Sequence, residues 1–463
     1  MSARIAIAGG GLSGIAAACA LAGAGHQVTL FERRAFLGGR ASSYEHPGTG
    51  EVVDNCQHVL LGCCTNLLDL YRRLGVTDRV RWYRKITFLE PGGRAGSLAS
   101  TALPAPLHSG ISFAAFPLLS IKDKLGIARA LVKLMPGVPA ETSEDFLSWL
   151  RRHGQTQRAI DRFWAPVLIS SLNEDLDKCS VHYSAMVFRD AFLKSADASA
   201  MGVPTIPLSD LYGVAAGYIR ARGGEVLLRC PVDSLDCEAD AAIVRAAGEE
   251  LRFDYAISAV PFHAVHKLLP QGEAAEAIRE KVSHLHTVPI TGIHLWFDRE
   301  VTAMEHAALL DRTIQWMFQK SKIQPARAEQ SGQGSYLELV VSASKTLLEM
   351  GRAEVIELAV REMAEFFPKV REAKLLKATV VKEVHATFAP APGHDAYRLP
   401  PQTSWPRLFL SGDWTKTGWP ATMEGAVRGG YLTAEAVAHA SGNARRFLAP
   451  DLAPQGLMRL FRP

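Results

Sequence analysis

The stretch RIAIAGGGLSGIAAACALAGAGHQVTLFE, residues 4–32, decides the fold. Its apolar run at 4–8 predicts a short buried strand, the small residues at 15–24 predict a helix, and the run at 26–32 predicts a second strand. Glu32 ends that second strand, about 20 residues after the turn, where a carboxylate accepts hydrogen bonds from ribose hydroxyls. This order of strand, turn, helix, strand and acid predicts a dinucleotide-binding βαβ unit.

Three glycines make the turn between the first strand and the helix suitable for binding a phosphate group. Gly9 permits the tight turn, Gly11 leaves room for a pyrophosphate, and Gly14 lets the helix pack closely on the sheet. The helix N-terminus then presents free amide hydrogens and the positive end of its dipole to the phosphates. A secretory signal peptide is the rival interpretation of this apolar stretch. The three consecutive glycines and the strand that ends in an acid argue against it.

The composition is that of a globular enzyme without a nucleic-acid partner. The chain has 463 residues, of which 48% are hydrophobic and 21% charged, enough for two or three domains. A net charge of +4 without a dense basic block argues against nucleic-acid binding. The seven cysteines include no C-x-x-C pair, so we expect no disulfide framework, no metal site and a reducing, cytoplasmic compartment. Outside the glycine turn, no apolar run is long enough to predict a transmembrane helix.

Two later segments could hold further parts of the same ligand. Gly39 and Arg40 follow the second strand, where the backbone can approach the ligand and a guanidinium can neutralise a phosphate. Near the other end of the chain, 408–410 predicts a buried strand that leads to Asp413, whose carboxylate suits a diphosphate-ribityl chain. A helix is expected over 422–439, and its first amides could support negative charge on a reduced flavin ring. A solvated Gly-Gly turn is the alternative interpretation of the first segment, and a Gly-Asp pair followed by a helix is a weak signal when taken alone.

The segment 102–135 differs in character from the rest of the chain. It is rich in proline and large apolar side chains, and 121–135 predicts an amphipathic helix. The cations on much of its other side are Lys122, Lys124, Arg129 and Lys133. A helix lying on an anionic membrane surface has this pattern. A surface helix packed on the core has the same pattern, so both interpretations stay open.

The remaining segments predict a second domain built from interleaved pieces. One helix is expected over 66–74 and several helices over 143–200. In the second range, Ser143 is expected to cap the first helix and Gly154 to end that helix. Three short strands are expected within 223–260, and residues 170–180 predict a polar loop. The other expected elements are strands at 285–300, 335–342 and 375–388 and a helix at 346–367.

Several motifs together resemble those of the FAD-dependent amine-oxidase and carotenoid-desaturase superfamily. They are GGGLSG at 9–14 with Glu32, LGGR at 37–40, and SGDWTKTGWPATMEGAV at 411–427. Within that superfamily, VVDNCQHVLLGCCTN at 52–66 is similar to a motif of plant-type phytoene and zeta-carotene desaturases. Weaker similarities are LPAPLHSG at 103–110 and SSLNEDLDKCSV at 170–181. The likeness covers most of the chain and is least at the termini and at 301–335.

The resemblance implies FAD as the cofactor and places it residue by residue. The positions that match the adenosine-diphosphate half are Gly9, Gly11, Leu12, Ser13, Gly14, Glu32, Arg33, Gly39, Arg40 and Ala41, with Val232 as a backbone contact to adenine. Gln57 and His58 match residues beside the isoalloxazine ring. The C-terminal flavin contacts are matched by Gly412, Asp413, Pro420, Thr422 and Met423.

The fold class implied is α/β, with an amine-oxidase-like, Rossmann-type FAD-binding domain and an interleaved α+β substrate domain. We expect the FAD-binding domain to be discontinuous, formed by residues 1–95, 207–268 and 402–442. The substrate domain is expected over 96–206 and 269–401, with membrane-contacting helices within 102–135. Residues 443–463 are expected to form a C-terminal tail.

Within the superfamily, the stretches at 52–66 and 411–430 are most similar to the squalene-associated branch, the hydroxysqualene dehydroxylases. Cys56 stands where carotenoid desaturases usually have glycine, and Gly429 stands where serine is usual. The first departure favours the dehydroxylase branch. The implied reaction is reductive removal of the allylic hydroxyl of hydroxysqualene, which gives squalene for hopanoid synthesis. A carotenoid desaturase or isomerase is the alternative.

The implied reaction needs an acid, because hydroxide is a poor leaving group. The candidates are His58, Asp54, Glu174 and Asp175, and His58 comes first because the resemblance places it beside the flavin. The implied partners are a long apolar isoprenoid, an unidentified electron donor and membrane lipid, since such a substrate would be loaded from the inner face of the cytoplasmic membrane.

Two further alternatives remain. The first is an amine or protoporphyrinogen oxidase, for which Trp414 and Trp419 could supply paired aromatic rings, although no lysine beside the flavin can be assigned. The second is a flavin-binding subunit without catalytic activity, which would bind FAD and show no turnover.

Overall fold

The computed structural model describes residues 2–324, 326 and 334–461. A five-stranded parallel sheet carries the N-terminal unit, in the order β10-β2-β1-β14-β20. Its strands are β1 (Arg4–Ala8), β2 (Gln27–Glu32), β10 (Glu225–Leu228), β14 (Tyr255–Ser258) and β20 (Leu408–Leu410). Strands from the start, the middle and the end of the chain therefore meet in one parallel sheet.

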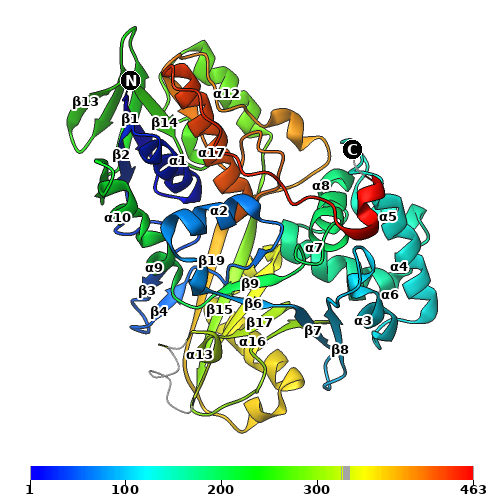
Figure 1. The fold of residues 1–463 in the computed structure, drawn as a ribbon. Helices are drawn as coiled ribbons and strands as arrows, with labels where there is room; N and C mark the ends of the chain where they lie inside the picture. Colours follow the sequence, from blue (N-terminus) through cyan, green and yellow to red (C-terminus); the bar gives the residue numbers. More distant parts are fainter. Residues whose placement is uncertain (1, 325, 327–333, 462–463) are drawn as a thin grey trace.

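Helices α1 (Leu12–Gly23) and α17 (Met423–Ala440) pack against each other over this sheet (Figure 1). Their approach is close, because a Cβ atom at Gly430 would lie 2.3 Å from the carbonyl oxygen of Ser13. The helix expected at 15–24 begins three residues earlier, directly after Gly11. Gly9 allows this early start because its positive φ of 117° completes the reversal of the chain before the helix begins.

The segment 223–260 holds five strands instead of the three expected. Two of them, β10 and β14, belong to the parallel sheet. The other three form an antiparallel meander on the same domain, namely β11 (Val232–Cys237), β12 (Ala242–Ala246) and β13 (Glu249–Phe253).

A second sheet of seven strands forms the platform of the other domain, in the order β19-β15-β18-β17-β16-β7-β8. Its strands are β7 (Lys85–Leu89), β8 (Ala95–Ala99), β15 (Thr287–Phe297), β16 (His306–Leu309), β17 (Trp316–Gln319), β18 (Ser335–Ser342) and β19 (Leu375–Phe388). The three strands expected between 285 and 388 are confirmed. The expected domain boundary at 95 is wrong, because β7 and β8 already pair in this sheet and the first FAD-binding segment ends before Lys85.

The helix expected at 346–367 is two helices, α15 (Lys345–Glu349) and α16 (Arg352–Phe366). Met350 and Gly351 are both extended and separate them. The amide of Gly351 donates to the Glu354 side chain, so the second helix has its own N-terminal cap.

Residues 107–193 form a helical layer beside the second sheet (Figure 1). Its helices are η2 (Leu107–Ser109), α3 (Gly110–Ala115), α4 (Ile121–Leu134), α5 (Phe146–Arg152), α6 (Gln157–Ala159), η3 (Ile160–Trp164), α7 (Ala165–Leu172), α8 (Val181–Met186) and η4 (Val187–Leu193). Asp145 caps α5 in place of the expected Ser143, and α5 ends at Arg152, before Gly154. The polar loop expected from 170 begins after Leu172, because α7 extends to that residue.

Shorter elements connect the domains. They are strands β3 (Ser43–Glu45), β4 (Val52–Asp54), β5 (Leu60–Leu61), β6 (Val80–Tyr83) and β9 (Met201–Pro204), and helices α2 (Thr65–Leu74), η1 (Thr77–Arg79), α9 (Leu208–Gly213), α10 (Ala215–Arg220), α11 (Phe262–Val265), α12 (Glu273–Ser283), α13 (Lys320–Ile323), η5 (Pro368–Arg371) and η6 (His394–Tyr397). In the ranges that the structure describes, no helix combines the length and apolarity needed to cross a membrane.

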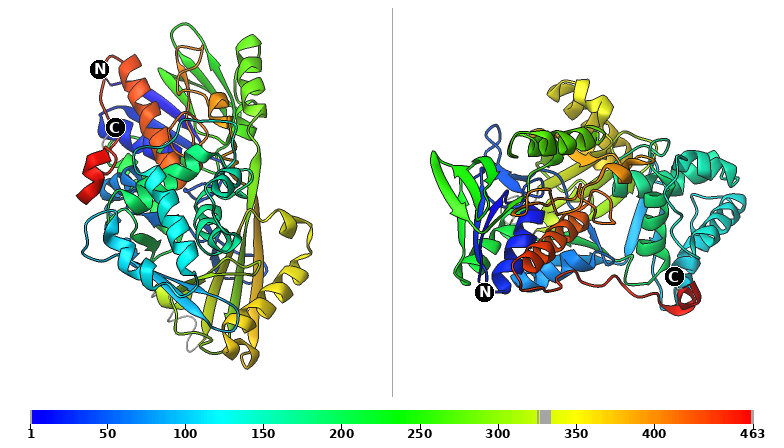
Figure 2. Two further views of the ribbon diagram at one scale, coloured as in Figure 1. Left: turned by 90° about the vertical axis from the view of Figure 1, so that its right-hand side faces the viewer. Right: turned by 90° about the horizontal axis from the view of Figure 1, so that it is seen from above.

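The expected C-terminal tail is packed against the helical layer. It runs from α17 along the outside of the molecule and ends in η7 (Gly456–Phe461), as Figure 2 shows. Asp451 pairs with Arg428 at 2.6 Å, the amide of Leu457 donates to the Ala105 carbonyl, and Met458 is fully buried. The tail thus connects the FAD-binding domain to the helical layer.

Candidate functional site

One large cavity of 1140 Å³ extends through both domains. All the residues predicted to hold FAD line it except Gly14, from the glycine turn and Glu32 through Gln57 and Val232 to Asp413 and Met423. The far part of the same cavity lies among the helices of the second domain. The structure therefore brings the dispersed sequence motifs together along one wall.

Gly14 lies beneath the turn instead of in the cavity. A Cβ atom there would lie 1.9 Å from the carbonyl oxygen of Gly9, and one at Gly39 would lie 2.9 Å from the Cα atom of Gly11. The two glycine segments thus touch through their backbones, and Gly11 also forms a β-bridge with Gly38. This leaves a backbone cradle at the N-terminus of α1, which is the surface that a pyrophosphate requires.

Glu32 lies at the end of β2 and faces the same part of the cavity. Its carboxylate accepts hydrogen bonds from the amides of Gly10 and Arg34, both at 2.7 Å. These bonds fix the carboxylate beside the glycine turn. Because each oxygen can accept more than one bond, the ribose hydroxyls can still be bound.

Arg40 and Asp413 link the two ends of the sequence across the cavity. The guanidinium of Arg40 donates to the Asp413 carboxylate at 2.8 Å and to the Ala386 carbonyl at 2.6 Å. A Cβ atom at Gly429 would lie 2.4 Å from the carbonyl oxygen of Gly412. Glycine at 429, where serine is usual, therefore lets α17 approach the Gly412–Asp413 turn.

The N-terminus of α17 closes the flavin end of the cavity. Thr422 caps the helix by accepting a hydrogen bond from the Gly425 amide at 3.0 Å. Glu424 in the first turn is fully buried and accepts bonds from the amides of Asn66 and Leu67, which are the first amides of α2. Burial raises the pKa of Glu424, although these amide donors oppose the shift. Two helix N-termini are thus fixed beside the cavity by one carboxyl group.

His58 is the acid candidate that faces the cavity. Its Nδ1 donates to the Cys56 carbonyl at 2.7 Å, which leaves Nε2 as the acceptor of the neutral ring. Burial lowers the pKa of His58, and the nearby charges of Arg40 and Lys320 lower it further. His58 is therefore mostly neutral at pH 7.

Asp54 does not line the cavity. Its carboxylate is 1% exposed and accepts from the Lys320 ammonium at 2.6 Å. The same ammonium contacts Glu338 at 3.1 Å and the side-chain oxygen of Gln57 at 2.8 Å. The structure therefore places this acid candidate in a buried ion cluster with Lys320, apart from the residues that line the cavity.

Glu174 and Asp175 are also outside the cavity. Both carboxylates pair with the ammonium of Lys345, and Asp175 is half-exposed. Asp175 also lies 3.9 Å from Lys178. The structure therefore places both acid candidates in an ion cluster around Lys345, away from the residues that line the cavity.

Apolar side chains line the part of the cavity beyond His58, which we call the tunnel. Its lining comes from β7, α3, α4, η3, α7, η4 and β17, and includes Ile86, Phe88, Phe113, Leu131, Phe163, Val167, Val187, Phe188, Phe192, Trp316 and Phe318. Six of the seven residues of η4 line it. The wide turn of a π-helix, which is common at functional sites, supports this arrangement.

The tryptophan pair of the oxidase alternative does not form two equivalent walls. Trp414 is buried and its indole donates to the Val260 carbonyl at 3.1 Å. Both tryptophans line the cavity, but Trp419 is partly exposed and lies under the guanidinium of Arg428. Among the described residues, the lysine on the cavity wall is Lys267, which follows α11.

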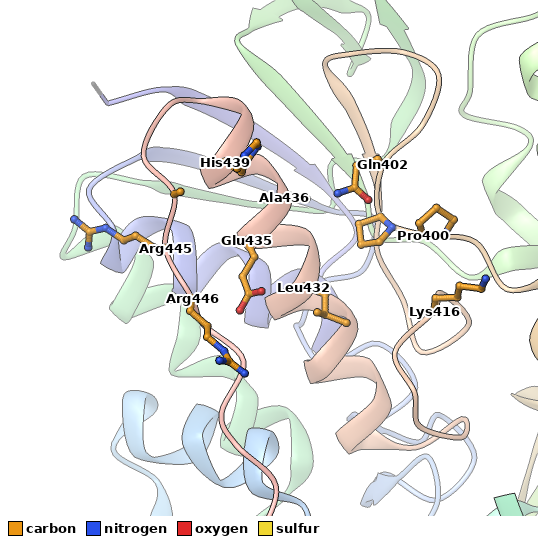
Figure 3. A pocket seen from close by; sticks show the side chains of 11 residues that line it. Pro400, Gln402, Lys416, Leu432, Glu435, Ala436, His439, Arg445 and Arg446 are labelled. Atoms are coloured by element: carbon orange, nitrogen blue, oxygen red, sulfur yellow. The ribbon is translucent and has the colours of Figure 1, made fainter. Parts of the chain in front are cut away.

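A second hollow lies on the far side of α17, between 400–402 and 444–446 (Figure 3). Its cations do not converge, because Lys416 and Arg445 point away from each other at opposite edges. Glu435 is engaged with the amides of Phe447 and Leu448. The hollow therefore has surface charge but no assembled site.

Two site residues were missed at the level of sequence. Lys320 falls in 301–335, where the resemblance to known motifs is least. Glu424 stands in the quoted motif, but its contact with α2 joins residues more than 350 positions apart. The apolar run before Lys320 could have indicated a buried lysine, but not its partners.

The chain matches the family model described as flavin containing amine oxidoreductase over residues 12–438. The 15-cis-phytoene desaturase of Synechococcus elongatus is 27% identical, over 94% of this chain and 95% of the relative. The zeta-carotene desaturase of a Synechocystis species is 26% identical, over 94% of this chain and 97% of the relative.

Solved structures resemble this fold over its whole length. A putrescine oxidase variant superposes with a TM-score of 0.73 at 18% identity, over 95% of this chain and 99% of the other. An oxidoreductase from Methanosarcina mazei superposes with a TM-score of 0.71 at 18% identity, over 92% of this chain and 98% of the other. These likenesses show the fold, and the family match shows that the cofactor of the cavity is a flavin, FAD.

Proposed function

We propose that this chain, which belongs to the flavin-containing amine oxidoreductase family, uses FAD to replace the allylic hydroxyl of hydroxysqualene with hydrogen, giving squalene. The observation that carries the proposal is the single cavity that joins the FAD residues to a long apolar tunnel. A thirty-carbon polyene gains about 0.8 kcal/mol for each buried CH₂-sized group, so a tunnel of this kind binds it strongly. A small polar amine would gain little from the same walls.

The reaction balances with one two-electron donor per turnover. The allylic C–O bond breaks, a C–H bond forms at the same carbon, and the oxygen leaves with a proton as water. FAD supplies the hydride chemistry when it is bound and reduced.

His58 serves this chemistry through the nitrogen that faces the cavity. The neutral ring accepts a hydrogen bond from the substrate hydroxyl at Nε2, which orients the C–O bond. Because burial lowers its pKa, the protonated ring is scarcer but a stronger acid than an ordinary imidazolium. The turnover rate should therefore rise as pH falls below 7. H58Q should remove that rise while retaining FAD.

The tunnel mouth supports loading from a lipid surface. Pro106, Gly110, Phe113 and Leu131 line the cavity and are each partly exposed, so we propose that the tunnel opens beside α3 and α4. Of the 14 large apolar side chains that the described residues expose, eight lie in 103–132 and 457–460, including Ile121, Leu125 and Leu460. The charges beside them on α4 are mostly cations, which suits anionic lipid. We place the enzyme on the inner face of the cytoplasmic membrane.

A carotenoid desaturase is the second candidate, and the relatives with that name favour it. That reaction removes hydrogen from the polyene, so electrons would flow in the opposite direction. Cys56, which is buried on the wall of the cavity where desaturases usually have glycine, favours the dehydroxylase.

Product analysis separates the two candidates. The purified holoenzyme is supplied with hydroxysqualene and a chemical reductant, or with phytoene and an oxidant, in the same detergent. We expect squalene from the first mixture and unchanged phytoene in the second. Desaturated products from phytoene, without squalene, would overturn the proposal in favour of the desaturase.

A further inference from the structure

A fully buried lysine, Lys320, lies behind the flavin-facing loop. Its ammonium donates hydrogen bonds to Asp54 at 2.6 Å and to the side-chain oxygen of Gln57 at 2.8 Å, and it forms an ion pair with Glu338 at 3.1 Å. Asp54 comes from β4, Lys320 from α13 and Glu338 from β18. The cluster therefore joins the two domains at the point where the cavity passes between them.

The lysine determines which way the Gln57 amide faces. An ammonium can only donate, so it must contact the side-chain oxygen of Gln57 and never its nitrogen. The NH₂ group is then on the opposite side. One of its hydrogens goes to the His58 carbonyl at 2.9 Å, and the structure assigns no partner to the other. Gln57 lines the cavity, whereas Lys320 and Asp54 do not.

We propose that Lys320 is a positioning residue that holds the Gln57 amide so that its second N–H donates to the flavin ring. A serine or asparagine in place of Lys320 would allow the amide to turn over, because either can accept as well as donate. The ammonium removes that freedom. Gln57 thus acts as a fixed hydrogen-bond donor to the cofactor, and Lys320 acts through it.

The flavin acceptors that we propose for this N–H are N1 and the carbonyl oxygens. The reduced ring carries more negative charge at these atoms than the oxidised ring, so the donor stabilises the reduced form more. Lys320 therefore makes the bound flavin easier to reduce. The inference rests on FAD binding and does not depend on the identity of the substrate.

The chain contains a matched control for a purely structural role. Lys345 also lies between two carboxylates, Glu174 and Asp175, but its cluster does not line the cavity. Removing either lysine leaves two acids without their shared cation. Of these two lysines, only Lys320 forms a hydrogen bond with a residue on the cavity wall, namely Gln57.

The test measures the reduction potential and visible spectrum of the bound flavin in Q57L, K320M, the double variant Q57L/K320M, and K345M. We expect Q57L and K320M to lower the reduced-to-oxidised ratio at a fixed potential by roughly fivefold, the effect of one hydrogen bond. The double variant should show no further change, since both substitutions remove the same bond. K345M should match the unmodified protein.

Additive shifts in the double variant, or a shift for K320M without one for Q57L, would overturn the proposal. Should K320M give no folded holoprotein, K320M/E338Q removes one charge of each sign and tests the same bond. Q57E, which keeps the ion cluster but offers oxygens in place of the amide N–H, must lower the ratio as well. An unchanged potential in Q57E would also contradict the proposal.

Discussion

The two ends of the cavity are built in different ways. At the cofactor end, backbone atoms of short contiguous motifs form the surface, and Gly9, Gly11 and Gly39 leave it without side chains. At the tunnel end, large side chains from β7, α3, α4, α7, η4 and β17 form the walls. The two ends should therefore respond differently to substitution.

The largest effect is expected at the cofactor end. A Cβ atom at Gly14 would lie 1.9 Å from a backbone oxygen, so G14V forces the turn apart. We expect loss of FAD from the purified protein, measured by flavin absorbance after gel filtration. G217A, in α10 of the same domain where a Cβ atom meets nothing within 4 Å, is the control. Full flavin content in G14V would break the comparison.

The next effect is expected in the tunnel, without loss of the cofactor. V187D places a carboxylate in the apolar wall of η4, and an unpaired ion in such surroundings costs several kcal/mol. We expect kcat/KM with the isoprenoid to fall by roughly 100-fold or more while the flavin content stays unchanged. L376D, on an exposed part of β19, should leave both unaffected. A parallel loss of flavin in V187D would show that the two ends are not separable.

A third effect concerns the mouth of the tunnel. Each lysine near an anionic bilayer contributes about 1 kcal/mol, so K122E/K124E/K133E should weaken vesicle binding by about 100-fold or more. L457S/L460S in η7 should weaken it by less, and K281E/K369E/K374E, elsewhere on the surface, should not change it. Vesicles containing phosphatidylglycerol and sedimentation give the measurement. Unchanged binding in the first variant would remove the lipid surface from the account.

The smallest effect is on stability in acid. Burial lowers the pKa of His108 and His306 in the substrate domain below the ordinary value of 6.5. As the pH falls below 6.5, these two rings become protonated in the unfolded chain before they do so in the folded chain. Their contribution to the free energy of unfolding is therefore complete above pH 6.5 and is lost as the pH falls below it. The urea concentration at the midpoint of unfolding should be lower at pH 5.5 than at pH 7.5. This difference between the two midpoints should be smaller in H108Q/H306Q. Equal midpoints in the unmodified protein would contradict this.

The sequence predicts the cofactor end well because its physics is local. A strand, a helix and three glycines within 30 residues specify the turn, and the structure confirms β1, β2 and β20. The residue that caps a helix is harder to predict, because several neighbouring polar residues can cap the same helix. Asp145 caps α5, whereas the sequence predicted Ser143. The boundary at 95 failed because strand pairing of β7 with β16 joins residues more than 200 positions apart.

The acid candidates show the same limit at the site itself. A carboxylate near a motif cannot be told from a catalytic one until its partners are known. Asp54 lies 266 positions from Lys320, and Glu174 lies 171 positions from Lys345. Both acids are satisfied by lysines that no local pattern identifies. His58 lines the cavity, and it stands in a motif that the resemblance to known desaturases already singled out.

The most direct test of the account is a single turnover without oxygen. The holoenzyme is reduced chemically to completion, freed of reductant and mixed with one equivalent of hydroxysqualene in detergent. We expect the flavin absorbance of the oxidised form to return as squalene appears in equal amount. A flavin that stays reduced, with hydroxysqualene recovered unchanged, would contradict the claim that the cavity carries reductive dehydroxylation.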